Sequence, residues 1–340
     1  MEQGRQDRRL HARLGLRGAG RAAIALVVVS LGLYLAAFAN VHAQNFPVRP
    51  VRLVVNFPAA SGTADAVARA LSQYLTRKWG QPVTVDNIPG ATGLVGAEAA
   101  YRAEPDGYTL LVTPAGALTV AQHLQKLVYD PTQFVPISML ETSPIVLVAS
   151  PHLAAKTVPE LMAYARANPD KLRVANHGIG SSSHLAAEWF RSAARVKIMH
   201  VPFRGSVAAL RGLSEGRVDI LFDNLGSSLE PIRNGQVKAL AVASVKPEPA
   251  LPGVPTIAQT LPGFVTSSWV AVVAPPKTPP ALAKWLSGEF ANALEQPRIK
   301  QALADLACEP VGSTPEATGA FIRKESERWK AVIKDAKISL

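Results

Sequence analysis

Short apolar runs alternate with helical patterns along most of this 340-residue chain, and that alternation limits the folds open to it. Residues 51–57 are apolar enough for a buried strand, and 66–80 place apolar side chains at helical spacing. A short strand follows at 83–85, then a helix at 94–103 and a strand at 108–112. This β-α-β-α-β order predicts an α/β fold with a mostly parallel, doubly wound sheet flanked by helices.

A second alternating series begins near Ile145. We expect strands at 145–149, 172–175, 198–201, 218–222 and 237–242, and helices from Thr157 and at 185–194, 207–215 and 229–234. After a proline-rich stretch, a strand is expected at 270–274, and the remaining chain is mostly helical, ending in an amphipathic helix at 315–334. Two successive units predict two lobes, joined near 142–144 and again near 266–269.

The first 43 residues have the pattern of an export signal. A basic segment with six arginines ends at Arg21, an apolar run covers 22–39, and Val41-His42-Ala43 places small residues at a signal-peptidase site. We predict cleavage after Ala43. The alternative is that the apolar run stays in place as a membrane anchor.

Charge and residue usage exclude several classes of protein. The net charge is +11, of which residues 1–43 carry +4, and the remaining +7 is scattered without a basic stripe, so no nucleic-acid partner is expected. The one cysteine, Cys308, permits no intrachain disulfide and no multi-cysteine zinc site. The seven histidines lack metal-ligand spacing, so neither a metal nor a cofactor is predicted.

Two turns join a strand to a helix and are rich in small or hydroxyl residues. The first is 57–65, where Thr63 or Asp65 is the expected N-cap, and the second is 176–184, with Gly180 followed by serines. Helix N-termini offer free N–H groups and partial positive charge, so both turns suit an anion. The alternative for the first is an ordinary capped turn. A third turn, 201–206, could contribute a Phe203 wall and an Arg204 cation, or be an ordinary surface turn.

A secreted serine hydrolase is the rival from another class. It would use Ser182 or Ser183 with His184, but neighbouring residues of a helix point in different directions, so the pair is a poor nucleophile and base. The turn also lacks a GxSxG nucleophile elbow. We therefore expect a binding protein, with His184 acting as a local hydrogen-bond partner.

Motifs in a fixed order resemble the extracytoplasmic receptors of tripartite tricarboxylate transporters, the TctC or Bug family. The resemblance covers about 46–338 and is carried by FPVRPVRLVV (46–55), DAVARAL (65–71), DNIPGATG (86–93), PDGYTLL (105–111), GSSSHLA (180–186), HVPFRG (200–205), LFDN (221–224), ALPGVPT (250–256) and EPVGSTP (309–315). Together, in this order, the motifs are specific.

The resemblance implies a two-lobed Venus-flytrap fold. Lobe one would hold 44–144 and 268–340, and lobe two 145–267. A carboxylate would lie between them, held mostly by backbone groups of the turns. Carried over by position, the ligand-binding residues would be Phe57, Ala59, Ala60, Ser61, Gly62, Thr63, Asp65 and Thr113 in lobe one, and Gly180, Ser181, Ser182, Ser183, His184, Phe203 and Asp223 in lobe two.

Two positions depart from the family's pattern. Its first turn is usually glycine-rich after the proline, whereas this chain has Ala59, Ala60 and Ser61 before Gly62. Because alanine disfavours left-handed backbone angles, we expect such angles to be excluded there and the turn to be tighter. After Thr113, Pro114 replaces a residue that usually donates a backbone N–H, which removes one donor.

The expected function is capture of a small carboxylate: a di- or tricarboxylate, an amino acid or an aromatic acid. The resemblance implies a monomeric periplasmic receptor that delivers this ligand to the membrane subunits of a transporter. An orphan ligand sensor that serves a signalling partner is the alternative.

Overall fold

The predicted alternation of strands and helices is present in a computed structural model of the protein, which describes residues 46–60, 62–178, 180–335 and 337–338. The predicted leader over 1–43 and the predicted site residue Ser61 lie outside the described residues. The chain from Arg49 onward folds as one unit. Its strands join into one ten-stranded sheet with the order β2-β1-β3-β9-β4-β7-β5-β6, to which β8 and β10 are added by pairing with β4.

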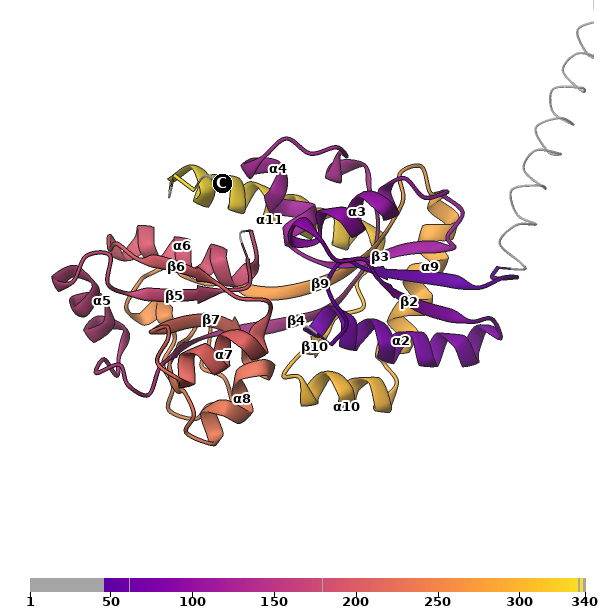
Figure 1. The fold of residues 1–340 in the computed structure, drawn as a ribbon. Coiled ribbons are helices and arrows are strands. Elements are labelled where there is room, and N and C mark those ends of the chain that lie inside the picture. Colours follow the sequence, from indigo (N-terminus) through magenta and orange to yellow (C-terminus); the bar gives the residue numbers. More distant parts are fainter. Residues whose placement is uncertain (1–45, 61, 179, 336, 339–340) are drawn as a thin grey trace, which may run out of the picture. The chain divides into compact units, whose positions relative to one another are not determined.

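The first series forms one end of the sheet. β1 (Val51–Val55) lies between β2 (Val83–Asn87) and β3 (Thr109–Pro114) and is parallel to both. α2 (Thr63–Trp79) and α3 (Leu94–Tyr101) cover opposite faces of these strands (Figure 1). Parallel strands are covered on both faces in this way, which is why the apolar run of β1 is almost wholly buried.

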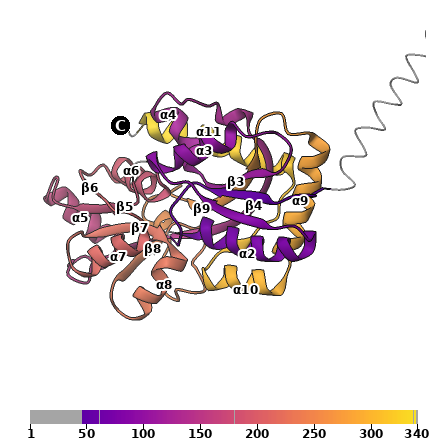
Figure 2. The ribbon, with the colours of Figure 1, turned by 45° about the vertical axis from the view of Figure 1, so that its right-hand side comes forward.

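Two antiparallel strands cross the middle of the sheet (Figures 1 and 2). β4 (Val135–Ala149) pairs with β9 (Ser267–Ala274) as far as Pro144, and with β7 and β8 from Ile145 onward. The sequence predicted only the second part of β4, because prolines and the polar segment around Glu141 interrupt the apolar pattern of the first part. The sheet is therefore mixed: parallel within each series and antiparallel at the crossing.

The second series forms the other end of the sheet. β5 is parallel to both β6 and β7, while β7 and β8 are antiparallel to β4. Its elements are β5 (Arg173–Asn176), β6 (Met199–Pro202), β7 (Ile220–Asn224), β8 (Lys238–Val242), α5 (Val158–Ala167), α6 (Ser182–Ala194), α7 (Ser206–Ser214) and α8 (Leu225–Arg233).

The C-terminal helices pack beside the first series. α9 and α10 contact α2, and α11 contacts α4 (Figure 2). The short β10 pairs with β4 at Glu141 and Thr142. The bounds are α4 (Ala121–Leu124), α9 (Pro280–Leu294), α10 (Pro297–Asp305), β10 (Glu309–Pro310) and α11 (Pro315–Asp335).

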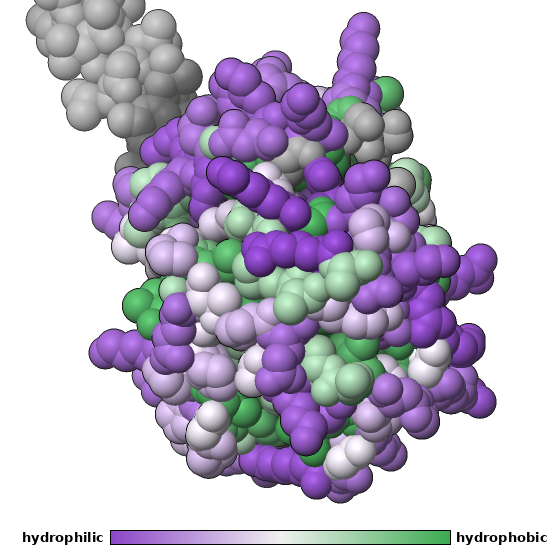
Figure 3. All heavy atoms as spheres, turned by 90° about the vertical axis from the view of Figure 1, so that its left-hand side faces the viewer, coloured by the Kyte–Doolittle hydropathy of each residue, from purple (hydrophilic) through white to green (hydrophobic). Residues whose placement is uncertain are grey.

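Apolar side chains gather between the sheet and its helices. Phe190, Phe222 and Phe264 are fully or almost fully buried in the second series, and Trp269 of β9 is buried beside the first. On the face formed by the second series, hydrophobic residues appear in small groups among hydrophilic ones (Figure 3). No helix among the described residues combines the length and apolar character needed to cross a bilayer.

Candidate ligand-binding site

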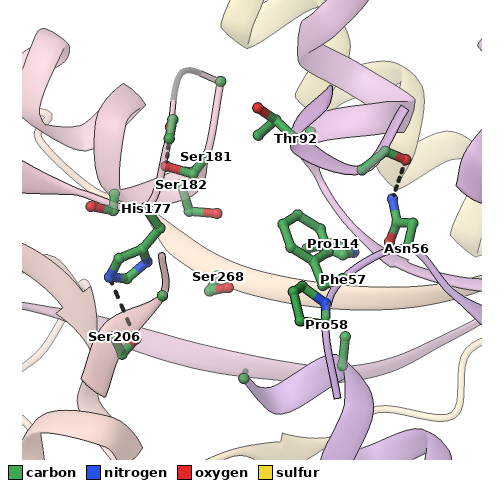
Figure 4. A pocket seen from close by; sticks show the side chains of 18 of the residues that line it. Asn56, Phe57, Pro58, Thr92, Pro114, His177, Ser181, Ser182, Ser206 and Ser268 are labelled. Atoms are coloured by element: carbon green, nitrogen blue, oxygen red, sulfur yellow. Dashed lines mark hydrogen bonds between the residues drawn. The ribbon is translucent and has the colours of Figure 1, made fainter. Parts of the chain in front are cut away.

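A cavity of about 690 Å³ lies where the strands of both series end. Turns from the first series form one wall, turns from the second form the opposite wall, and Ser268 of β9 lies between them (Figure 4). Ile145 of β4 also lines the cavity. Ligands of open α/β sheets bind outside the carboxyl ends of the strands, so the cavity has the position of a binding site. Its lining includes the predicted residues Phe57, Gly62, Thr63, Asp65, Gly180, Ser181, Ser182, Ser183 and Phe203.

The other predicted residues lie close to the cavity but are not part of its lining. Ala59 and Ala60 are exposed in the turn before α2. Thr113 is fully buried, and its hydroxyl donates to the carbonyl of Pro114 at 3.0 Å. His184 and Asp223 are buried behind the lining. Contact between these residues and a ligand stays a prediction.

The turn before α2 is held by Asp65. The helix begins after Gly62, which makes no side-chain cap, so the predicted capping by Thr63 or Asp65 is wrong. Asp65 sits inside the first turn and accepts a hydrogen bond from the Ala60 N–H at 2.9 Å, while Arg69 and Asn87 donate to the same carboxylate. Although burial opposes it, these bonds lower the pKa of Asp65. The carboxylate is thus bound within the turn, and Gly62, Thr63 and Asp65 at the helix start line the cavity.

Ala60 corrects one expectation. Its φ is +55°, a left-handed angle that the alanines of this turn were expected not to adopt. The Cβ of alanine makes this angle costly, by about 1–2 kcal/mol. The hydrogen bond from the Ala60 N–H to the buried Asp65 carboxylate offsets part of that cost. The turn therefore has, at an alanine, a left-handed backbone conformation that glycine adopts more easily.

The turn before α6 forms the opposite wall. Ser181 caps the helix: its hydroxyl accepts from the His184 N–H at 3.2 Å and donates to the Gly178 carbonyl at 2.7 Å. The Gly180 N–H donates to Nδ1 of His184 at 3.3 Å. His184 is therefore the local hydrogen-bond partner that the sequence predicted, and its ring holds the turn from behind.

Two buried polar atoms in the lining have no partner among the described residues. They are the hydroxyl oxygen of Ser183, in the first turn of α6, and Oδ1 of Asn56, at the end of β1. Asn56 uses its other amide atom to donate to the Gly93 carbonyl at 2.9 Å. Buried polar groups normally have hydrogen-bond partners, so these two atoms are exceptions within the cavity lining.

A cluster behind the second turn keeps His184 neutral. Burial, and next the nearby His200, lower the pKa of His184 to about 4. The two rings lie 4.7 Å apart, and Nε2 of His200 is 2.6 Å from the Glu188 carboxylate, which Arg191 also contacts. Although burial alone would raise it, the hydrogen bonds from His200 and Arg191 lower the pKa of Glu188 to about 2. A neutral His184 can accept the Gly180 N–H.

His177, Ser206 and Asp223 have the residue types of a hydrolase triad but not its arrangement. The Ser206 hydroxyl donates directly to Asp223 at 2.7 Å, and Nε2 of His177 lies 3.4 Å from the same carboxylate oxygen. In a triad the histidine stands between the serine and the acid. Here the Ser206 hydroxyl also lies 3.5 Å from Nε2 of His177, but it donates its proton to the acid, and the same Nε2 faces both groups. The group instead places one imidazole edge and one hydroxyl on the cavity wall (Figure 4).

Several lining residues were not predicted as site residues. Thr92 belongs to the 86–93 motif, and a Cβ added at Gly178 would lie 3.7 Å from its hydroxyl oxygen, so the two walls meet there. Arg204 was weighed in the sequence and lines the cavity. Asn56 directly follows β1 and Ser268 lies near the start of β9, and no motif in the sequence singled out either residue as part of a site. Pro114, His177 and Ser206 are further lining residues of this kind.

Comparisons with known proteins agree on one family. Residues 67–338 match the tripartite tricarboxylate transporter family receptor, TctC. A UPF0065 protein from the tcbD-tcbE intergenic region of Pseudomonas sp. strain P51 is 36% identical over 297 residues, covering 86% of this chain and 88% of that protein. Protein BugT of Bordetella pertussis is 35% identical over 315 residues, covering 90% and 95%.

Solved structures share the fold. R. palustris Rpa4515 with adipate has a TM-score of 0.80 at 34% identity, covering 86% of this chain and 99% of that one. MatC from Rhodopseudomonas palustris with bound malate has a TM-score of 0.78 at 34% identity, covering 85% and 100%. The periplasmic binding protein BugD has a TM-score of 0.78 at 32% identity, covering 86% and 99%.

These findings confirm the predicted two-lobed α/β fold and the predicted class, a solute-binding receptor and not an enzyme. The match spans most of the described chain, and the motifs that carried the resemblance lie within or beside it. The chain belongs to the tripartite tricarboxylate transporter receptor family, TctC/Bug.

Proposed function

We propose that this protein captures a small carboxylate in the cavity between its two lobes. The observation that carries the proposal is the pair of helix N-termini, α2 and α6, on opposite walls of one cavity, with the unpartnered Ser183 hydroxyl beside the second. Free N–H groups at helix starts suit an anion. The structures with adipate and malate, both carboxylates, support the same ligand class.

The proposed grip uses both turns. In lobe one the backbone of 57–63 receives the carboxylate, with Asp65 and the buried Thr113 supporting the turn, and in lobe two the contacts come from 180–183, with His184 behind them. Phe203 forms a wall, and Asp223 holds Ser206 and His177 in place. We infer that the lobes comprise 44–144 with 268–340, and 145–267, because β4 and β9 pair through the segments where these boundaries fall.

The family membership supports a periplasmic receptor that delivers its ligand to the membrane subunits of a tripartite tricarboxylate transporter. We propose that residues 1–43 direct export, with cleavage after Ala43, and that the protein acts as a monomer. Uptake of a labelled acid into vesicles that contain the membrane subunits should require added protein. Uptake that proceeds equally without it would contradict the role in transport.

A thermal-shift panel tests ligand capture. Malate, adipate, citrate, aspartate and benzoate are each added over a range of concentrations. A true ligand raises Tm as its concentration rises relative to Kd, and at 100 times Kd it adds about 2.7 kcal/mol to the free energy of unfolding. Ser183→Ala should weaken binding about tenfold or less, because one hydrogen bond is lost. Ser214→Ala, at the end of α7 and outside the cavity lining, is the matched control. If no acid shifts Tm, the proposal fails.

A further inference from the structure

Glu141 is a buried acid that the proposed binding mechanism does not use. It lies in β4 with 0% of its surface exposed, and neither carboxylate oxygen has a hydrogen-bond partner among the described residues. An ionised carboxylate in such a place is costly unless it is paired, so the group favours its protonated form. Burial, the dominant influence, raises the pKa of Glu141 to about 7.

The strand geometry connects Glu141 to the cavity. Between Glu141 and Pro144 the pairing of β4 with β9 is regular, with Ser143 opposite Ser268. Alternate residues of a strand share a face, so Glu141, Ser143 and Ile145 form one row. Ile145 and Ser268 line the cavity, and the Ser143 hydroxyl, the next in the row, is also buried without a partner. A polar row thus leads from the cavity lining to Glu141.

The start of α2 connects the two sites a second time. The Thr63 side chain lies near the Glu141 carboxyl without forming a hydrogen bond of ordinary geometry, and Thr63 also lines the cavity in the first turn of α2. An ionised Glu141 and an anion in the cavity would therefore lie near the same helix N-terminus. Like charges repel, and both would draw on the same positive end of the helix.

No fixed charge of the surrounding elements compensates Glu141 within the described part of the chain. The other interacting group is the Cys308 thiol, between α10 and β10, whose own pKa burial and Glu141 raise. Several charged groups on the packed elements are engaged elsewhere: Asp65 with Arg69 on α2, Glu325 with Arg328 on α11, Glu289 of α9 with Lys78, Lys238 of β8 with the Leu153 carbonyl, and Asp223 of β7 with serine hydroxyls. Lys284 of α9 and both Glu230 and Arg233 of α8 are exposed. Glu309 of β10 is exposed.

We propose that Glu141 is a proton-binding site coupled to anion binding at the start of α2, so that the receptor takes up its carboxylate together with a proton. The inference rests on the proposed function. Binding of the anion favours protonated Glu141, and loss of that proton weakens anion binding. Affinity is therefore highest at low pH and falls as Glu141 ionises, by at most about tenfold per pH unit for one proton.

Calorimetric titration with malate and adipate tests the coupling between pH 6.5 and 8.5, where both acids stay ionised. In buffers of different ionisation enthalpy, the wild type should take up a fraction of a proton on binding, and its Kd should rise with pH. Glu141→Gln keeps the shape and removes the charge, so its affinity should lose most of this pH dependence and exceed that of the wild type at pH 8.5. An equal pH dependence in wild type and Glu141→Gln overturns the inference.

His177 requires its own control, because an imidazole on the cavity wall would also favour anions at low pH. His177→Asn should keep the part of the pH dependence that Glu141→Gln removes. A pH dependence lost in His177→Asn and kept in Glu141→Gln would assign the proton to the histidine and refute the proposal.

A ligand-free measurement separates this inference from the proposed function. Carboxyl ¹³C NMR of glutamate-labelled protein, with Glu141→Gln for assignment, should show one glutamate that titrates near neutral pH. If no acid binds at any pH, the proposed function fails and this titration alone decides whether Glu141 binds a proton. A Glu141 resonance that titrates near pH 4 overturns the site.

Discussion

The Gly180 N–H donates to Nδ1 of His184 at 3.3 Å, so a buried, neutral imidazole holds the serine-rich turn from the side away from the cavity. The donor in this bond, the Gly180 N–H, belongs to the backbone of the turn. The Ser183 hydroxyl, in the first turn of the same helix, is buried without a hydrogen-bond partner among the described residues, and Ser183 belongs to the cavity lining.

Replacement of His184 should weaken ligand binding through the shape of this turn. His184→Leu removes the acceptor and leaves the Gly180 N–H unpaired, whereas His184→Asn keeps an oxygen near the position of Nδ1. A lost hydrogen bond of this kind costs about 1 kcal/mol, or about fivefold. We expect Leu to raise Kd by about that factor or more and Asn to restore part of it, measured by calorimetry. Equal Kd values for both variants would mean that the bond does not position the turn.

Acid should destabilise the protein through the same histidine. The folded-state pKa of His184, about 4, lies below its ordinary value of 6.5, so the unfolded chain binds the proton first as pH falls. Stability should therefore be full above pH 6.5 and decline down to about pH 4, by about 3 kcal/mol for the whole shift. Urea unfolding at several pH values measures this decline, and His184→Asn should show a smaller one over that range.

Glu188 should extend this decline to lower pH. Its folded-state pKa of about 2 lies below the ordinary 4.5, so its contribution is present above pH 4.5 and is lost as pH falls toward 2. Glu188→Gln should be less stable than the wild type at neutral pH and lose less stability below pH 4.5. A variant with an unchanged acid limb in urea unfolding would contradict this.

Ala60→Gly should not destabilise the first turn, although glycine usually does. The left-handed φ of +55° at Ala60 costs alanine energy that glycine does not pay, so we expect a gain of up to about 1 kcal/mol in the free energy of unfolding. Ala59 is the neighbouring control: its φ is not positive, and Ala59→Gly should lose about 0.5–1 kcal/mol. Thermal unfolding of both variants compares them, and the same loss in both would show that Ala60 is unstrained.

Two helical glycines should respond to alanine in opposite directions. A Cβ at Gly226 of α8 would lie 1.8 Å from the Leu306 carbonyl oxygen, whereas a Cβ at Gly288 of α9 meets nothing within 4 Å. Gly226→Ala should cost about 3 kcal/mol or more, because backbone must move. Gly288→Ala should gain up to about 1 kcal/mol from helix propensity. Urea titrations measure the free energy of unfolding of both variants. An unchanged free energy of unfolding in Gly226→Ala would mean that α8 and the chain near Leu306 separate easily.

Local patterns were enough to predict most elements. The periodicity that predicted a helix at 66–80 and the capping sequence at Thr157 act over a few residues, and the structure has α2 and α5 there. The first part of β4 was missed because Glu141 and the flanking prolines break the apolar pattern. A strand of that composition is stabilised by its pairing with β9, which lies far along the chain.

The order of strands and helices, the two turns at helix starts and, through the motifs, the family can all be predicted from the sequence. These depend on spacing, capping and composition, which are local. Which side chains meet depends on the folded arrangement of the whole chain: Thr92 lies opposite Gly178, Asp223 lies between His177 and two serines, and Glu141 lies near Thr63. Such contacts arise when the crossing strands bring distant segments together, and no local rule specifies them.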